Sequence, residues 1–110
     1  MSLPKLTPQE RRQALEKAQR LRKERAEIRR QLKAGEIALS SLLAQEPDEI
    51  TGRMRVDHIL QSLPSVGKKI ASKIMEEIGI ADSKRLGGLS PRQQMELMAF
   101  AQRFEERKKA

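Results

Sequence analysis

The fold is decided by residues 63–74, which read Leu63-Pro64-Ser65-Val66-Gly67-Lys68-Lys69-Ile70-Ala71-Ser72-Lys73-Ile74. Pro64 and Gly67 favour a tight reversal of the chain that ordinary residues resist. Apolar residues then recur at the spacing of one helical face, at Ile70, Ala71, Ile74 and Met75. The pattern predicts a helix-hairpin-helix whose second helix begins directly after the turn.

Such a turn ends at a helix N-terminus, where backbone N–H groups have no intrahelical partner and the helix dipole is positive. We expect the amides of residues 66–69 to suit a phosphate oxygen. Lys68, Lys69 and Lys73 add positive charge on the same side. The alternative is an ordinary turn between two helices with solvated lysines, and the spacing alone does not separate the two interpretations.

Composition favours the phosphate-binding interpretation. The 110 residues carry a net charge of +8 and the isoelectric point is about 10.3, which favours a polyanionic partner. The sequence has no long apolar run and no secretory signal, so we expect a cytoplasmic protein without a membrane partner. It has no cysteine and a single histidine, His58, which provide no zinc-ligand set. We therefore expect no metal and no cofactor.

The first 33 residues hold most of the charge excess, with eleven basic residues against four acidic ones. Thr7-Pro8-Gln9-Glu10 is a capping box with proline at the first helical position, and the next glycine or proline is Gly35. The pattern predicts a basic helical arm over residues 1–33 and a separate domain over residues 34–110. The apolar residues of the arm form a stripe too narrow for a core: Ala14, Ala18, Leu21, Ile28 and Leu32.

The charge of the arm has two interpretations. In the first, the arm is a solvated helix with ion pairs such as that of Glu16 with Arg20. In the second, it contacts nucleic acid, which relieves the repulsion among its uncompensated positive charges. We favour the second, and Arg22, Arg25 and Arg29 are the candidate contacts.

A basic segment precedes the hairpin. After a short helix predicted around residues 37–43, Arg53 and Arg55 alternate with Met54 and Val56. Alternation places the two arginines on one face while their neighbours pack inward. The segment lies just ahead of a helix predicted over residues 56–63, so both arginines are candidate DNA contacts, and exposed arginines without a function are the alternative.

A second basic loop follows the helix predicted over residues 68–78, which ends at Gly79. It contains Lys84 and Arg85 and the flexible pair Gly87 and Gly88, and it is a candidate second phosphate-binding loop. A plain connection between helices is the alternative. The last helix is predicted to begin at the capping box Ser90-Pro91-Arg92-Gln93 and to end in a frayed tail over residues 105–110; its apolar residues are Met95, Leu97, Met98, Ala101 and Phe104.

These motifs carry a resemblance. The hairpin, Gly79-Ile80, the Lys84/Arg85 loop and Leu89-Ser90 resemble the helix-two-turns-helix module of a small-subunit ribosomal protein and of formamidopyrimidine-type DNA glycosylases. The order of motifs over residues 3–104 is similar to that of the actinobacterial integration host factor family: Leu3-Pro4-Lys5-Leu6-Thr7-Pro8, then Ala14-Leu15-Glu16-Lys17-Ala18, then Gly52-Arg53-Met54-Arg55-Val56 and the hairpin.

The resemblance implies an all-α fold in which a long basic helix precedes a compact helix-two-turns-helix domain. It also implies a nucleoid-associated protein that binds double-stranded DNA with little sequence preference, bends it, and assists chromosome compaction and site-specific recombination beside a recombinase. We expect a monomer. The candidate DNA contacts are Arg22, Arg25, Arg29, Arg53, Arg55, Ser65, Val66, Gly67, Lys68, Lys69, Lys73, Lys84, Arg85, Gly87 and Gly88.

One residue departs from the family pattern, which is Leu-Pro-Gly-Val-Gly in the hairpin. Ser65 replaces the first glycine here. If that position requires a positive φ, serine strains the turn. The resemblance then implies a modest change of hairpin geometry or affinity.

Three other functions are weighed against DNA binding. An RNA-binding protein of the ribosomal type is the main alternative, because phosphate contacts do not distinguish the two duplexes. A fragment of a glycosylase or nuclease would need a nucleophile or base in a pocket, and only Asp57 and His58 are weak candidates. A helical adaptor for another protein would need an exposed apolar patch, against which the charge argues. We therefore expect a protein that is not an enzyme.

Overall fold

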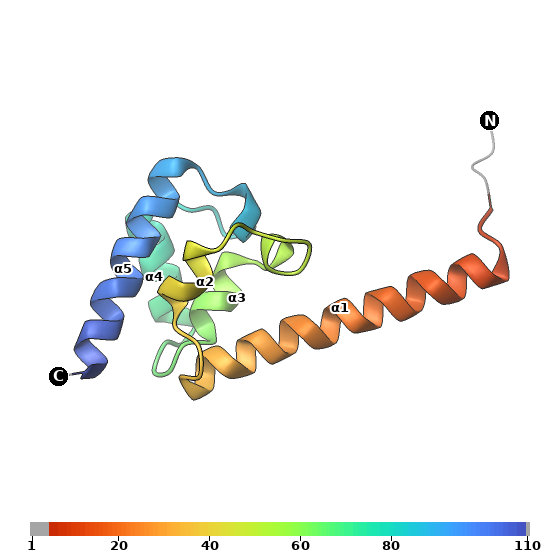
Figure 1. Ribbon diagram of the computed structural model, residues 1–110. Helices are drawn as coiled ribbons and strands as arrows, with labels where there is room; N and C mark the ends of the chain where they lie inside the picture. The colour runs from red at the N-terminus through yellow and green to blue at the C-terminus, as the bar shows by residue number, and fades with distance from the viewer. Residues whose placement is uncertain (1–4, 110) are drawn as a thin grey trace.

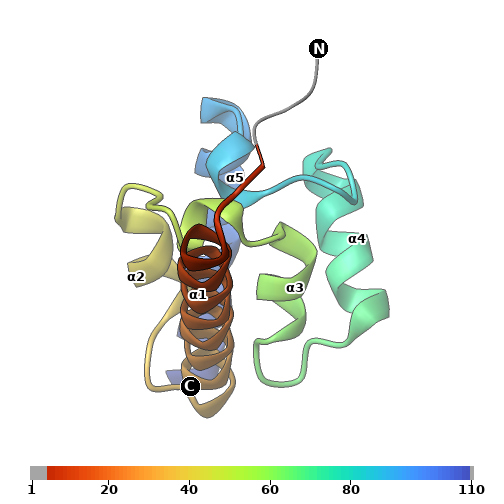
Figure 2. The ribbon, with the colours of Figure 1, turned by 90° about the vertical axis from the view of Figure 1, so that its right-hand side faces the viewer.

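The computed structural model describes residues 5–109. Its regular structure is helical, and the elements follow in the order α1 (Pro8–Ala34), α2 (Leu39–Ala44), η1 (Thr51–Arg53), α3 (Val56–Gln61), α4 (Lys68–Ile78), η2 (Leu86–Gly88) and α5 (Pro91–Lys109). Helix α1 extends away from a body formed by α2 to α5 (Figure 1). Seen along the axis of α1, helix α2 lies on one side, and α3 and α4 lie on the other (Figure 2). The all-α prediction is confirmed.

Helix α1 begins and ends where its local signals predict. The Thr7 hydroxyl accepts a hydrogen bond from the Glu10 amide at 3.1 Å. Gly35 ends the helix in the left-handed conformation with φ +74°, which glycine adopts without steric cost. The 27 residues of α1 span about 40 Å at the rise of an α-helix, and residues 5–20 are all exposed.

The last turns of α1 belong to the core. Leu32 has 1% of its surface exposed and Leu21 has 8%, and Ile28 packs against the core cluster. The expectation that the stripe buries little is therefore wrong for its C-terminal part, although Ala14 and Ala18 are exposed. The separate domain over residues 34–110 stays a prediction, and Leu32 lies on the arm side of that division.

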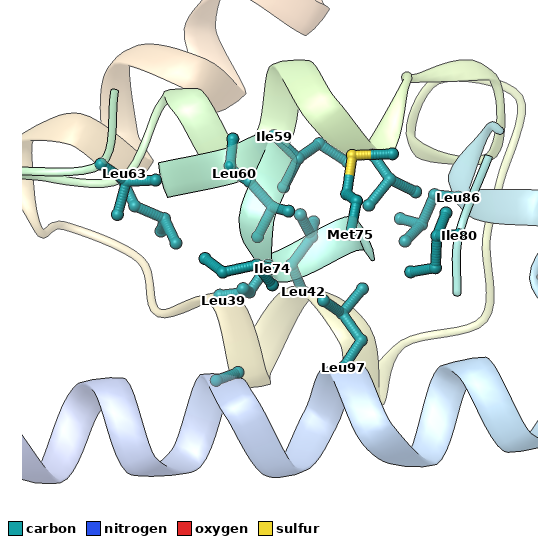
Figure 3. Packing of buried hydrophobic residues seen from close by; sticks show 14 of the residues in the cluster. Leu39, Leu42, Ile59, Leu60, Leu63, Ile74, Met75, Ile80, Leu86 and Leu97 are labelled. Atoms are coloured by element: carbon teal, nitrogen blue, oxygen red, sulfur yellow. The ribbon is translucent and has the colours of Figure 1, made fainter. Parts of the chain in front are cut away.

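The core lies between α2, α3, α4 and α5 and is aliphatic. Ile59 and Leu60 of α3 face Met75 of α4, while Leu39 of α2 and Leu97 of α5 close the other side (Figure 3). All five side chains are at most 1% exposed. Helix α3 ends at Gln61, earlier than the predicted 63, and the Leu63 amide turns back to the Leu60 carbonyl, three residues before it, at 3.1 Å.

The turn between α3 and α4 differs from its prediction. Gly67 has an ordinary extended conformation (φ −90°, ψ −175°), and Ser65 takes the positive φ of +66°. The chain therefore reverses at Ser65, and Gly67 is not needed for it. The Val66 amide also donates to the Leu63 carbonyl at 3.2 Å. The amides left without a backbone acceptor in the described structure are those of residues 67–70, one position later than expected.

The two capping signals around α5 are confirmed. Gly79 ends α4 at φ +83°. The Ser90 hydroxyl accepts from the Gln93 amide at 3.1 Å, and the Gln93 side chain accepts from the Ser90 amide at 2.9 Å. Both bonds of the capping box are thus present.

Two expectations about the helix faces and the tail are wrong. Ile70 is 49% exposed and Met95 is 74% exposed, so neither lies on the buried face to which the spacing assigned it. Helix α5 continues to Lys109, and the Glu105 carboxylate accepts bonds from the amide and the hydroxyl of Ser40 at 3.1 and 2.7 Å. The start of the predicted frayed tail is therefore an anchor between α5 and α2.

We expect Ser65→Gly to stabilise the protein by about 0.5–1 kcal/mol. An L-residue in the left-handed conformation costs about 1–2 kcal/mol, and the larger entropy that glycine loses on folding offsets part of the gain. The measurement is the midpoint of urea unfolding at unchanged slope. Ser72→Gly, an exposed site inside α4, is the control and should destabilise by about 0.5 kcal/mol. A destabilised Ser65→Gly variant would contradict the backbone strain.

We expect Leu32→Ala to destabilise the protein by about 2–5 kcal/mol, because it removes buried side-chain atoms and leaves a cavity. Leu15→Ala is the matched control on the same helix. Leu15 is 65% exposed, so its truncation should change the free energy of unfolding by less than about 0.5 kcal/mol. Equal small effects would show that α1 does not contribute to the core.

Candidate nucleic-acid interface

Two segments that are distant in the sequence pair side by side at the N-terminal end of α3. The Leu86 amide donates to the Met54 carbonyl at 2.9 Å, and the Val56 amide donates to the Lys84 carbonyl at 3.0 Å. Arg55 and Arg85 thereby face each other as an antiparallel bridge. Met54 and Val56 point into the core with 4% and 0% exposure, as the alternation predicts.

This pairing depends on two glycines. A Cβ added to Gly87 would lie 3.0 Å from the Gly52 carbonyl oxygen and 3.3 Å from its Cα. These distances are shorter than those of most Cβ contacts, so a side chain at Gly87 would require the Gly52 backbone to shift by a few tenths of an ångström. Gly87 therefore lies at a packed contact with Gly52, and the prediction of a flexible glycine pair at 87 and 88 is wrong for it.

Helix α1 passes beside this pairing and places three arginines opposite it. The result is a groove of about 420 Å³ between α1, α3 and the paired loops. We call it the arginine groove, and its lining residues are Arg22, Arg25, Ala26, Arg29, Arg53, Met54, Arg55, His58 and Arg85.

Two polar contacts hold α1 beside the groove. The Arg29 Nε donates to the Ser62 Oγ at 3.0 Å. Farther toward the N-terminus, the Lys17 ammonium lies 2.9 Å from the Glu49 carboxylate. This hydrogen bond to Lys17 lowers the pKa of Glu49 below its ordinary value. Together with the burial of Leu21, the contacts fix the C-terminal half of α1 against the body.

Most of the groove's positive charge is unpaired. The Arg55 guanidinium contacts the Asp57 carboxylate at 3.0 Å and the Asp82 carbonyl at 3.0 Å, while its Nε has no acceptor among the described residues. Arg85 donates to the Arg53 carbonyl, a neutral group. In the described part of the chain, Asp57 is the one carboxylate within 4.0 Å of an arginine of this groove. Walls of one sign focus the electric field inside a groove and attract anions.

Outside the groove, Arg30 of the arm is ion-paired. Arg30 lies 2.8 Å from both Glu27 and Glu36. The hydrogen bonds that Arg30 donates to Glu27 lower the pKa of Glu27 and are the first cause that raises the pKa of Arg30. The solvated, ion-paired interpretation of the arm therefore applies to Arg30, while Arg22, Arg25 and Arg29 have no carboxylate partner among the described residues.

A second surface at the start of α4, which we call the hairpin surface, contains other predicted contacts. Ser65, Gly67, Lys68, Lys69 and Lys73 are exposed there. None of them lines the arginine groove, and neither do Val66, which is buried, or Lys84, Gly87 and Gly88. The structure thus divides most of the predicted site residues between the groove and the hairpin surface, and Val66, Lys84, Gly87 and Gly88 belong to neither.

His58 is the groove residue that the sequence analysis did not assign to binding. Its side chain is 46% exposed, and its Nε2 lies 4.0 Å from the Asp57 carboxylate. It follows Arg55, the N-cap of α3, by three residues, and residues three apart in a helix lie on the same face. This spacing is the sequence signal that could have placed His58 beside Arg55.

Metal binding and membrane insertion have no counterpart among the described residues. These residues contain no group of three or more His, Cys, Asp or Glu side chains that is placed to hold a metal ion. No described helix is long and apolar enough to span a membrane.

The chain is similar to proteins of known family. Residues 32–104 match the model of the S13-like helix-two-turns-helix domain. Integration host factor of Streptomyces coelicolor is 45% identical over 94 residues, covering 84% of this chain and 88% of the relative. Integration host factor of Mycobacterium tuberculosis is 46% identical over 99 residues, covering 89% and 94%.

A solved structure shares the fold. It describes sIHF bound to an 8-base-pair palindromic DNA and superimposes with a TM-score of 0.74. Its sequence is 39% identical, and the match covers 78% of this chain and 98% of that one.

Proposed function

Because this chain belongs to the actinobacterial integration host factor family, we propose that it is a nucleoid-associated protein that binds double-stranded DNA with little sequence preference and bends it. The observation that carries the proposal is the convergence of six arginines on the arginine groove. Arginine donates in a planar fork that matches phosphate oxygens and also enters narrow minor grooves. The homologous sIHF bound to DNA supports the same partner.

The two basic surfaces have different parts in this proposal. The hairpin surface offers point charges and free amides at a helix N-terminus, which suit phosphates and read no sequence. The arginine groove offers guanidinium groups from α1 and from both paired loops, so a duplex edge seated there meets donors on two sides. Arginines that enter a minor groove favour a deformed duplex, and we assign bending to the groove.

The remaining parts of the proposal follow from the family. We propose that the protein acts as a monomer on the nucleoid, in the cytoplasm, and that bent DNA assists chromosome compaction and site-specific recombination. It is proposed to work without catalysis. Asp57, the weak candidate for an acid or base, is paired with Arg55 at 3.0 Å.

We expect binding to be dominated by phosphate contacts. If about six basic groups engage the duplex, the logarithm of affinity falls with the logarithm of salt concentration at a slope of roughly −5. Scrambled sequences should bind within about tenfold of one another. An RNA duplex of equal length should bind more weakly, because its wide, shallow minor groove does not concentrate negative potential around arginine. A preference for RNA would favour the ribosomal-type alternative, and strong sequence discrimination with a shallow slope would contradict the proposal.

We expect the groove variant Arg22→Gln, Arg25→Gln, Arg53→Gln to lose DNA bending at saturation. The hairpin variant Lys68→Gln, Lys69→Gln, Lys73→Gln removes the same charge and is the matched control. Each variant should make the negative salt slope shallower by about 3. The hairpin variant should still bend DNA once bound. The measurement is energy transfer between dyes at the two ends of a duplex. Equal bending by both variants would separate the groove from bending.

A further inference from the structure

We propose that the arginine groove also binds a free linear oligophosphate of three or more phosphates, either inorganic or as the phosphate tail of a nucleotide. Binding of the free chain stands on the geometry of the groove. Its competition with DNA rests on the proposed function.

The arginines of the groove come from two opposite walls. Arg22, Arg25 and Arg29 come from one wall, which is α1, while Arg53, Arg55 and Arg85 come from the opposite wall. A single tetrahedral anion would reach one wall at a time. A chain of linked phosphates presents oxygens on both sides along its length, so it would accept charge-assisted bonds from both walls together.

The volume of the groove fits a small anion chain. The groove volume of about 420 Å³ lies in the range of about 300–1,000 Å³ that is typical of small-molecule sites. A duplex can offer this space only the edge of its backbone. A free oligophosphate can enter it completely, and Ala26 and Met54 of the lining provide apolar surface that strengthens the field of the arginines.

The Arg55 guanidinium has a donor that is available to a ligand. Its Nη2 donates to the Asp57 carboxylate and the Asp82 carbonyl, but its buried Nε has no acceptor within residues 5–109. A buried donor without a partner is costly, and a small shift of the guanidinium toward the groove would offer this donor to a phosphate oxygen. Among the described residues both phenylalanines lie on α5 and neither lines the groove, so no aromatic ring is placed to stack a base. The groove should therefore recognise the phosphate chain and not the nucleoside.

The experiment is calorimetric titration of the full chain with sodium tripolyphosphate at about 150 mM ionic strength, where exposed charges are screened beyond about 8 Å. Sulfate at the same ionic strength is the anion control. We expect one site for tripolyphosphate and none for sulfate. ATP distinguishes the two sources of the chain: equal affinity for ATP and tripolyphosphate assigns recognition to the phosphates, and much tighter binding of ATP would overturn that assignment.

The variants of equal charge locate the site. The groove variant Arg22→Gln, Arg25→Gln, Arg53→Gln should weaken tripolyphosphate binding by at least about tenfold. The hairpin variant Lys68→Gln, Lys69→Gln, Lys73→Gln should change it by less than about twofold. The substituted arginines make no side-chain hydrogen bond or ion pair within the described structure, which limits damage to the fold. Equal losses in both variants would overturn the proposal, because they would reflect net charge alone.

A second measurement does not need the variants. In NMR spectra of the unaltered protein, tripolyphosphate should shift the imidazole signals of His58 and the Nε–H signals of the groove arginines. Shifts confined to residues 68–73 would overturn the proposal. The same titration into a protein–DNA mixture tests competition: if DNA binds and tripolyphosphate does not displace it, competition fails while the proposed function stands. If duplex DNA does not bind at all, the proposed function fails and the titration without DNA still decides the free-chain site.

Discussion

Two backbone hydrogen bonds, from Leu86 to Met54 and from Val56 to Lys84, join loops that lie far apart in the sequence. They leave the alternate side chains with opposite fates: Met54 and Val56 enter the core, and the arginines between and beside them turn outward. The Gly52–Gly87 contact allows the backbones to come this close. A bulkier residue at Gly87 would separate the loops, and one wall of the arginine groove would lose its definition.

Helix α1 supplies the other wall, and its charge is sorted by position. Arg30, which does not line the groove, is neutralised by Glu27 and Glu36. The arginines toward the groove have no carboxylate partner in the described structure, except Arg55 on the opposite wall. A surface ion pair contributes little to stability. The main effect of the Arg30 ion pairs is therefore to neutralise positive charge outside the groove. The same net charge spread evenly over α1 would give a weaker field in the groove.

Local signals in the sequence predicted the helices well. The caps at Thr7, Gly79 and Ser90 each act within one turn, so residue type is enough to recognise them. The positions of elements relative to one another were not predictable in this way. The arginine groove depends on a pairing between residues 54–56 and 84–86 and on the docking of α1, and neither leaves a periodic trace in the sequence. The reversal was assigned to Pro64 and Gly67, whereas Ser65 takes the left-handed conformation. The signal for it was the family pattern, which has glycine at that position. The anchor from Glu105 to Ser40 is likewise a single long-range contact.

The exposure of α1 changes along its length, from exposed side chains at residues 8–20 to burial at Leu32. An isolated helix of a dozen residues is only marginally stable in water, so the N-terminal turns depend on the docked ones for their order. Amide hydrogens in α1 should accordingly exchange along a gradient, fast near Pro8 and at the global unfolding limit near Leu32. The outermost charges, including Arg11 and Arg12, then sit on a segment that opens and recloses at equilibrium. The distance between these charges and the body is therefore an average over the closed and open states of this segment.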